Sequence, residues 1–136
     1  MIDLNQYIEN PEVVIWQANH WQPWEIIDNL ENIVLQYLKT IGSDYKVKDR
    51  ITIHKTATIE PGATLKGPLV IGKSSFIGAH AYLRGPIFLG NSVKIGPGSE
   101  IKQSIILDRT AIAHFNYIGN SILGQNINFE AGSICA

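Results

Sequence analysis

Aliphatic residues recur at every sixth position through the middle of the chain. The members of this run are Ile53, Ile59, Leu65, Ile71, Ile77, Leu83, Leu89, Ile95, Ile101 and Leu107. An α-helix does not keep a period of six, and a simple strand alternates its faces at every second residue. The pattern therefore predicts a chain that turns after every six residues.

Residues suited to tight corners fall at fixed places within this repeat. They are the glycines that directly follow an aliphatic residue, Gly72, Gly78, Gly90 and Gly96, and the prolines Pro61, Pro68, Pro86 and Pro97. Glycine tolerates the backbone angles of corners, and the missing N–H of proline costs little there. We expect residues 51–136 to form a parallel β-solenoid with three short strands per coil. Positions eighteen residues apart then stack about 4.8 Å from each other.

This pattern resembles the hexapeptide-repeat family over about two thirds of the chain. The resemblance implies a mainly β fold, a left-handed parallel β-helix. The left hand is taken from the family, because most parallel crossovers are right-handed and a period alone does not set the hand.

Residues 1–50 lack the six-residue period and are expected to form an N-terminal helical cap and a linker. Apolar side chains on one side of a helical pattern predict an amphipathic helix from Pro23 to about Ile41; they are Trp24, Ile27, Leu30, Val34, Tyr37 and Leu38. We expect this helix to cover an open end of the solenoid, with a ligand-binding role as the alternative. Gly42 to Arg50 then reads as a short linker.

The six-residue register slips twice after Leu107. The next residues of the pattern are Ile112, Ile118, Leu123, Phe129 and Cys135, so the steps to Ile112 and Leu123 are one residue short. A deletion in a tolerant loop explains a short corner, and so does a corner shaped around a ligand.

Composition removes several classes of function. Eleven Lys and Arg against twelve Asp and Glu give a net charge of −1, whereas nucleic-acid and membrane-surface binding need a basic excess. The single cysteine, Cys135, can form no internal disulfide. The first residues contain neither a basic leader nor an uninterrupted apolar stretch, so we expect a cytoplasmic protein without a membrane span.

Three cations, Lys66, Arg84 and Lys102, share the eighteen-residue spacing and are expected to lie above one another on one face. Like charges at this separation repel unless an anion or a carboxylate lies among them, so the column suggests a phosphate site, with Glu100 as a possible internal partner. A ladder of splayed, solvated side chains is the alternative.

His114 lies within the segment IAHFNYI, close to the predicted register slip. Histidine is the side chain best suited to accept a proton near neutral pH, although a lone histidine is more often structural. His20, His54 and His80 form no metal-ligand spacing with His114, so we expect no metal.

The stretch from Ile95 to Ala136, which contains both short steps, resembles a bacterial family without a gap. The family is the C-terminal domain of the bifunctional N-acetylglucosamine-1-phosphate uridyltransferase and glucosamine-1-phosphate acetyltransferase, with related sugar-1-phosphate nucleotidylyltransferases. The resemblance implies an N-acetyltransferase that uses acetyl-CoA and assembles as a homotrimer with its site between subunits.

The resemblance also assigns roles to individual residues. It implies that His114 is the general base, and that an oxyanion-stabilising N–H lies near Ala131. The implied ligands of the sugar phosphate are Arg84, Lys102, Tyr117 and Asn128.

The chain departs from this family in two ways. Fifty residues before the repeat cannot supply the α/β nucleotidyltransferase domain, so we expect no nucleotidyl transfer by this chain alone. The sequence stops at Ala136, where the family continues with further coils, so the β-helix is expected to be truncated. Three hypotheses follow: an acyltransferase or its truncated remnant, a non-catalytic sugar-phosphate-binding or regulatory trimer, and a purely structural trimerisation module.

Overall fold

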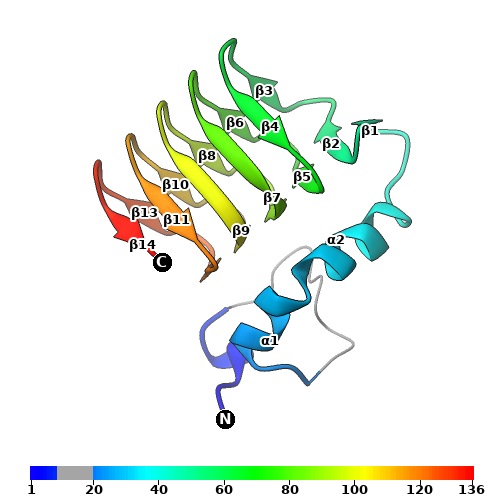
Figure 1. Cartoon of the computed structure of the whole chain (residues 1–136), viewed down its shortest axis with the longest axis vertical. Helices are drawn as coiled ribbons and strands as arrows, with labels where there is room; N and C mark the ends of the chain where they lie inside the picture. The colour runs from blue at the N-terminus through cyan, green and yellow to red at the C-terminus, as the bar shows by residue number, and fades with distance from the viewer. Residues whose placement is uncertain (9–19) are drawn as a thin grey trace.

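The computed structural model describes residues 1–8 and 20–136, which form a stack of coils with helices along one side (Figure 1). Residues 9–19 of the predicted N-terminal region lie outside the described residues. The helical elements are η1 (Leu4–Gln6), α1 (Pro23–Asp28) and α2 (Leu30–Leu38). The strands are β1 (Tyr45–Lys48), β2 (Ile51–His54), β3 (Thr58–Ile59), β4 (Thr64–Lys66), β5 (Leu69–Ile71), β6 (Phe76–Ile77), β7 (Tyr82–Leu89), β8 (Lys94–Ile95), β9 (Glu100–Ile106), β10 (Ala111–Ile112), β11 (Tyr117–Gly119), β12 (Ile122–Leu123), β13 (Asn128–Phe129) and β14 (Ile134–Cys135). The predicted left-handed parallel β-helix is confirmed.

The solenoid has three faces of parallel strands. The cation face comprises β4, residues 82–84 of β7, residues 100–102 of β9, β11 and β14. The helix face comprises β2, β5, residues 87–89 of β7, residues 104–106 of β9, and β12. The third face comprises β3, β6, β8, β10 and β13. The long strands β7 and β9 turn a corner, so each belongs to two faces.

The repeated aliphatic residues fill the axis of the solenoid. The aliphatic residues of the axis that are fully buried are Leu69, Ile71, Ile77, Leu83, Ile87, Leu89, Val93, Ile95, Ile101, Ile106 and Ile118. Successive side chains of a strand point to opposite faces, so each short strand sends one or two residues inward and exposes its neighbours. The axis therefore holds the fold together, while the outward residues are left to determine its contacts.

The first register slip lies one step earlier than the sequence predicts. Leu89 pairs with Ile106, so Ile106 lies in the axis, and Leu107 packs outside it in the cluster beneath the helices. The short steps therefore run from Ile101 to Ile106 and from Ile118 to Leu123, the second as predicted. Spacing alone could not decide which of the adjacent residues Ile106 and Leu107 lies in the axis, because both are aliphatic.

Both short steps fall at the corner between the cation face and the helix face. Earlier coils turn this corner with Gly67-Pro68 and Gly85-Pro86, whereas later coils use one residue, Gln103 or Asn120. Gln103 and Asn120 have φ values of 43° and 50°, which accommodate the sharper turn. The short corners thus directly follow the position of Lys102 and lie away from the corner of His114.

The helical segment lies along the side of the coils, on the helix face, and not over an open end (Figure 1). Ile26, Leu30 and Val34 are buried against outward side chains of the solenoid, including Phe88. The outward residues of this face are apolar, namely Val70, Phe88, Ile105 and Ile122, so a helix must cover them. The predicted helical cap therefore covers the side of the solenoid and not its open end.

The single helix predicted from Pro23 to Ile41 is two helices that meet at Asn29. Pro23 occupies the first turn of α1 as predicted, and the N–H of Gln22 donates to Glu25 Oε2 at 2.7 Å in a capping box. Ile27, Leu30 and Val34, on both sides of this interruption, are buried as predicted. Trp24, expected on the buried side, is 58% exposed.

The predicted linker contains a strand. Within residues 42–50, β1 pairs antiparallel with β2, and the turn between them uses positive φ angles at Asp49 and Arg50. This pairing adds a strand to the first coil, because β2 would otherwise present an open edge on that side.

Candidate functional site

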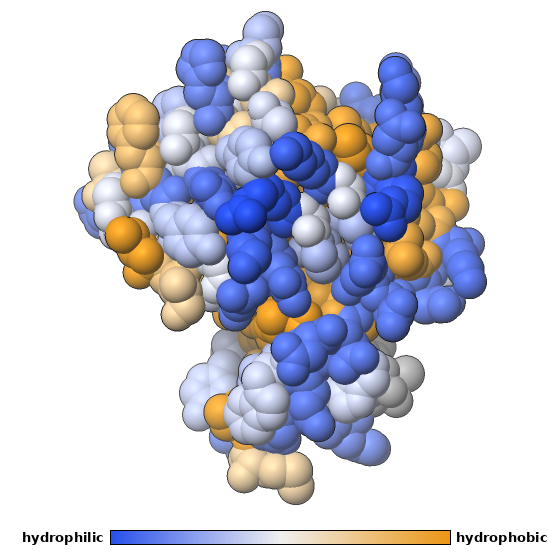
Figure 2. Space-filling view, viewed as in Figure 1, coloured by the Kyte–Doolittle hydropathy of each residue, from blue (hydrophilic) through white to orange (hydrophobic). Residues whose placement is uncertain are grey.

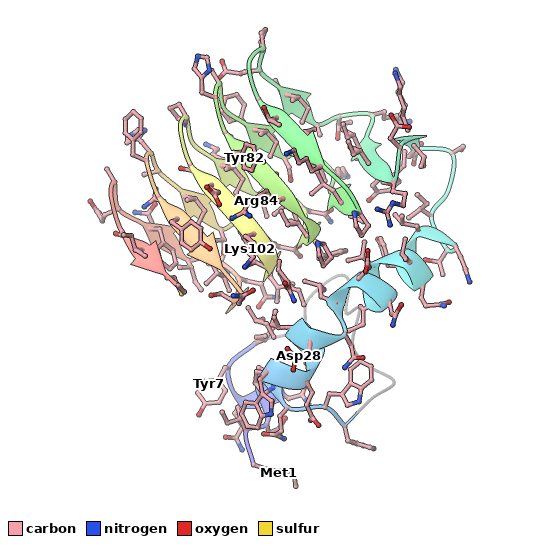
Figure 3. All side chains as sticks on the ribbon, viewed as in Figure 1. Met1, Tyr7, Asp28, Tyr82, Arg84 and Lys102 are labelled. Atoms are coloured by element: carbon pink, nitrogen blue, oxygen red, sulfur yellow. The ribbon has the colours of Figure 1, made fainter. Side chains whose placement is uncertain are left out.

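Two columns of outward side chains run across the cation face. One column contains Lys66, Arg84 and Lys102, which are direct partners in neighbouring strands. The second contains Tyr82, Glu100 and Tyr117. The predicted stacking of the three cations is thus confirmed by the strand register, and Figure 3 shows Tyr82, Arg84 and Lys102 grouped on β7 and β9.

Arg84 forms an ion pair with Glu100 on the adjacent strand. Its Nε donates to Glu100 Oε2 at 3.1 Å, and its Nη2 donates to the same oxygen. The Glu100 carboxylate raises the pKa of Arg84 above its ordinary value. The pair relieves the repulsion within the column by neutralising its central cation, in the internal role predicted for Glu100.

Lys66 and Lys102, on either side of this pair, differ in their surroundings. Lys66 Nζ donates to the hydroxyl of Tyr82 at 2.7 Å and lies 5.0 Å from the centre of that ring. Within residues 1–8 and 20–136, Lys102 Nζ has no carboxylate or hydrogen-bond partner. The cation face therefore carries positive charge without a carboxylate counter-charge at both ends of the column, which favours an anionic ligand.

Tyr117 lies beside Lys102 because Gly119 has no side chain. Gly119 pairs with Lys102, and a Cβ built on Gly119 would lie only 2.5 Å from Tyr117 Oη. The ring of Tyr117 therefore bends over the position where the next side chain of the column would stand. This arrangement brings a phenol hydroxyl close to the Lys102 position. In space-filling form, hydrophilic residues gather over this region of the face (Figure 2).

His114 lies at the corner between the third face and the cation face, three residues before Tyr117. The residue is exposed, and its carbonyl accepts the N–H of Gly132 in the following coil at 3.0 Å. The part of the chain that the structure describes supplies no hydrogen-bond partner for its ring. The imidazole is therefore accessible to a ligand from outside.

The two remaining predicted residues lie in different places. Ala131 occupies the corner one coil beyond His114, next to Gly132, and its N–H donates no backbone hydrogen bond among the described residues. Asn128 is on β13 of the third face and is exposed, while its neighbour Phe129 points into the axis. One chain thus brings together Arg84, Lys102 and Tyr117, places His114 beside Ala131, and leaves Asn128 on another face.

Tyr82 is a residue of the cation face that the sequence reasoning missed. It stands eighteen residues before Glu100, two positions ahead of Arg84, so the same period that reveals the cations would have revealed it. Among the described residues, no three His, Cys, Asp or Glu side chains gather as metal ligands do. No described helix is both long and apolar enough to cross a bilayer.

Comparisons with known proteins find relatives across most of the chain. The family model of the GMPPB C-terminal domain matches residues 65–135. A bifunctional sugar-1-phosphate nucleotidylyltransferase/acetyltransferase from Sulfurisphaera tokodaii is 36% identical over 132 residues, which cover 90% of this chain and 33% of that protein. The bifunctional protein GlmU of Methanococcus maripaludis is 40% identical over 118 residues, which cover 84% of this chain and 29% of that protein. The chain thus spans about a third of the length of these curated relatives.

Among solved structures, a perosamine N-acetyltransferase from Caulobacter crescentus aligns with 62% of this chain and 50% of its own. The sequence identity is 16% and the TM-score is 0.45. A likeness at this level carries no inference about function.

Proposed function

The chain belongs to the family of the GMPPB C-terminal domain, and we propose that it is an acetyltransferase acting on an amino-sugar 1-phosphate. The observation that carries this proposal is the cation face, where Lys102 stands beside the Arg84–Glu100 pair and the Tyr117 hydroxyl and has no carboxylate partner within residues 1–8 and 20–136. Relatives that match most of the chain are named as bifunctional nucleotidylyltransferase/acetyltransferases, which supports a transferase acting on sugar phosphates.

The proposed reaction moves an acetyl group from acetyl-CoA to the amine of the sugar. Lys102 and Arg84 hold the phosphate, and Tyr117 and Asn128 contact the sugar. As the amine nitrogen bonds to the thioester carbonyl carbon, His114 removes a proton from the nitrogen. The carbon–sulfur bond then breaks, and the CoA thiolate leaves and is protonated. In this proposal the N–H of Ala131, one coil from His114, donates to the carbonyl oxygen as it gains charge.

The division of these residues between two faces supports an assembly. Lys102 and Asn128 are on different faces of the prism, so a small sugar bound at Lys102 is out of reach of Asn128 of the same chain. A second copy that lays its third face near the cation face of the first would supply the missing amide. We propose a homotrimer with the site between subunits, which sedimentation equilibrium of the protein tests directly.

A non-catalytic function is the second candidate, and one observation favours it. A general base is usually oriented by a third group, and the His114 ring has no such partner among the described residues. A protein of this kind would bind the sugar phosphate without transferring an acetyl group. Thiol release from acetyl-CoA with glucosamine 1-phosphate or galactosamine 1-phosphate separates the two, since only the enzyme accelerates release above the rate without protein.

Removing the charge of Lys102 is expected to weaken sugar-phosphate binding. Lys102→Gln should lower the affinity for glucosamine 1-phosphate by about 10-fold or more, since a charge-assisted hydrogen bond contributes about 1.5–3 kcal/mol. Isothermal titration calorimetry measures this change. Lys39→Gln, an exposed lysine at the C-terminal end of α2 and on neither the cation face nor the third face, is the matched control and should bind normally. Equal losses in the two variants would contradict a phosphate site at Lys102.

Filling the space above Gly119 is expected to move Tyr117 off its position. The added methyl group of Gly119→Ala would lie 2.5 Å from Tyr117 Oη, so the ring must swing away. Glucosamine 1-phosphate affinity should then fall several-fold. Gly42→Ala is the control, because no atom lies within 4 Å of a Cβ there, and it should leave the affinity unchanged. An unchanged affinity in Gly119→Ala would remove Tyr117 from the proposed site.

A further inference from the structure

The cation column extends one coil beyond the residues that a sugar 1-phosphate needs. The proposed site uses Arg84, Lys102 and Tyr117, whereas Lys66 and Tyr82 lie at the other end of the same columns. Lys66 Nζ is held there by the Tyr82 hydroxyl, 2.7 Å away, and lies 5.0 Å from the centre of the Tyr82 ring. Arg84 is also near this ring, with Cζ 5.8 Å from its centre. The ammonium group of Lys66 therefore has a fixed position on the cation face.

The distribution of charge along the column distinguishes two kinds of anion. Lys66 and Lys102 are separated by two strand spacings, about 10 Å between backbones. Between them, Arg84 already pairs with Glu100, so the charges without a carboxylate partner among the described residues are at the two ends. A phosphate monoester concentrates its charge on one phosphorus and can engage one end. A diphosphate diester carries one charge on each of two linked phosphates, and it can engage both.

We propose that the cation face binds the diphosphate of a nucleotide sugar. Lys102 contacts the phosphate attached to the sugar, and Lys66 contacts the phosphate attached to the nucleoside. The sugar then lies at the Tyr117 end, on the strand that leads from the His114 corner, and the nucleoside extends past Tyr82. This inference rests on the proposed sugar-phosphate site and names its ligand class more closely.

The diphosphate could instead come from the CoA molecule, and the test separates these sources. Dissociation constants are measured for N-acetylglucosamine 1-phosphate, uridine diphosphate N-acetylglucosamine and CoA. The proteins are the unchanged chain, Lys66→Gln and the surface control Lys39→Gln. Lys66 is exposed, so its replacement is expected to leave the fold intact. Thermal melting of each variant verifies this.

The expected result is that the unchanged chain binds the nucleotide sugar more tightly than the sugar 1-phosphate. Lys66→Gln should weaken nucleotide-sugar binding by about 10-fold, the effect of one charge-assisted contact, and leave sugar 1-phosphate and CoA binding unchanged. Lys39→Gln should change none of the three. Equal affinities of the unchanged chain for the two sugar ligands would overturn the inference. Loss of CoA binding in Lys66→Gln would overturn it too, by assigning Lys66 to the coenzyme.

The same measurements distinguish failure of this inference from failure of the proposed function. Suppose that sugar 1-phosphate binding requires Lys102 and is unchanged in Lys66→Gln, and that nucleotide-sugar binding is also unchanged in Lys66→Gln. Only the extension to a diphosphate then fails. If neither sugar ligand binds the unchanged chain, the sugar-phosphate site itself is wrong and the inference falls with it.

Discussion

Replacing His114 with alanine is expected to lower the rate of acetyl transfer by about 10²- to 10⁴-fold, the usual contribution of a positioned general base. The physical reason is that the sugar amine must lose a proton as it attacks the thioester, and His114 is the group proposed to accept it. The measurement is thiol release from acetyl-CoA at saturating glucosamine 1-phosphate. Sugar-phosphate affinity should change little, because the phosphate is held by Lys102 and Arg84.

His80→Ala is the matched control for this prediction. His80 is also exposed and lies at a corner between the third face and the cation face, two coils before His114. Its ring packs over Gly62, so the variant loses a surface contact and should retain the full rate. If His114→Ala and the unchanged chain both release thiol only at the rate without protein, the catalytic hypothesis is wrong and the binding function remains.

Truncating Phe88 is expected to cost about 3–5 kcal/mol of unfolding free energy. Phe88 is 2% exposed between the helix face and the helices, and its ring meets that of Tyr37 edge-on at 5.3 Å. Alanine would leave a cavity in the layer that joins the helices to the coils. Because a domain of this size is stable by only about 5–15 kcal/mol, the loss is a large fraction of the total. Urea denaturation followed by circular dichroism measures it.

Phe115→Ala is the control, because it removes an aromatic ring from the surface and not from a buried layer. Phe115 is 73% exposed, so its removal should change the unfolding free energy by less than about 1 kcal/mol. A comparable loss in both variants would mean that the ring of Phe88 is no more important to the fold than a surface ring. The helix layer would then contribute little to stability.

Much of the solenoid could be predicted because its repeat is local. Each corner follows from a few residues, and parallel stacking then copies the same position from coil to coil. For this reason the column of Lys66, Arg84 and Lys102 and its partner Glu100 could be located from spacing. The position of the first short corner could not, since Ile106 and Leu107 are both apolar and both buried.

The location of the helices was beyond the reach of sequence pattern. An amphipathic helix signals that one side is covered, but not by what, and the open end and the helix face both offer apolar surface. The contact that anchors it is non-local: the side-chain amide of Gln103 donates to the carbonyl of Ile27 at 3.0 Å. Gln103 also forms the first short corner, so this hydrogen bond connects the short corner directly to α1.

By itself the sequence determined the coil, the three faces and the alignment of cations, because a strict period and parallel pairing leave one arrangement for outward side chains. Only the tertiary structure decided how those side chains pair. Arg84 turns to Glu100, Lys66 turns to Tyr82, and Lys102 pairs with no carboxylate in the part of the chain that the structure describes. Side-chain pairing across strands depends on rotamers and on the space at Gly119, which no spacing encodes. The solenoid therefore follows from local repetition, and its candidate site follows from contacts between coils.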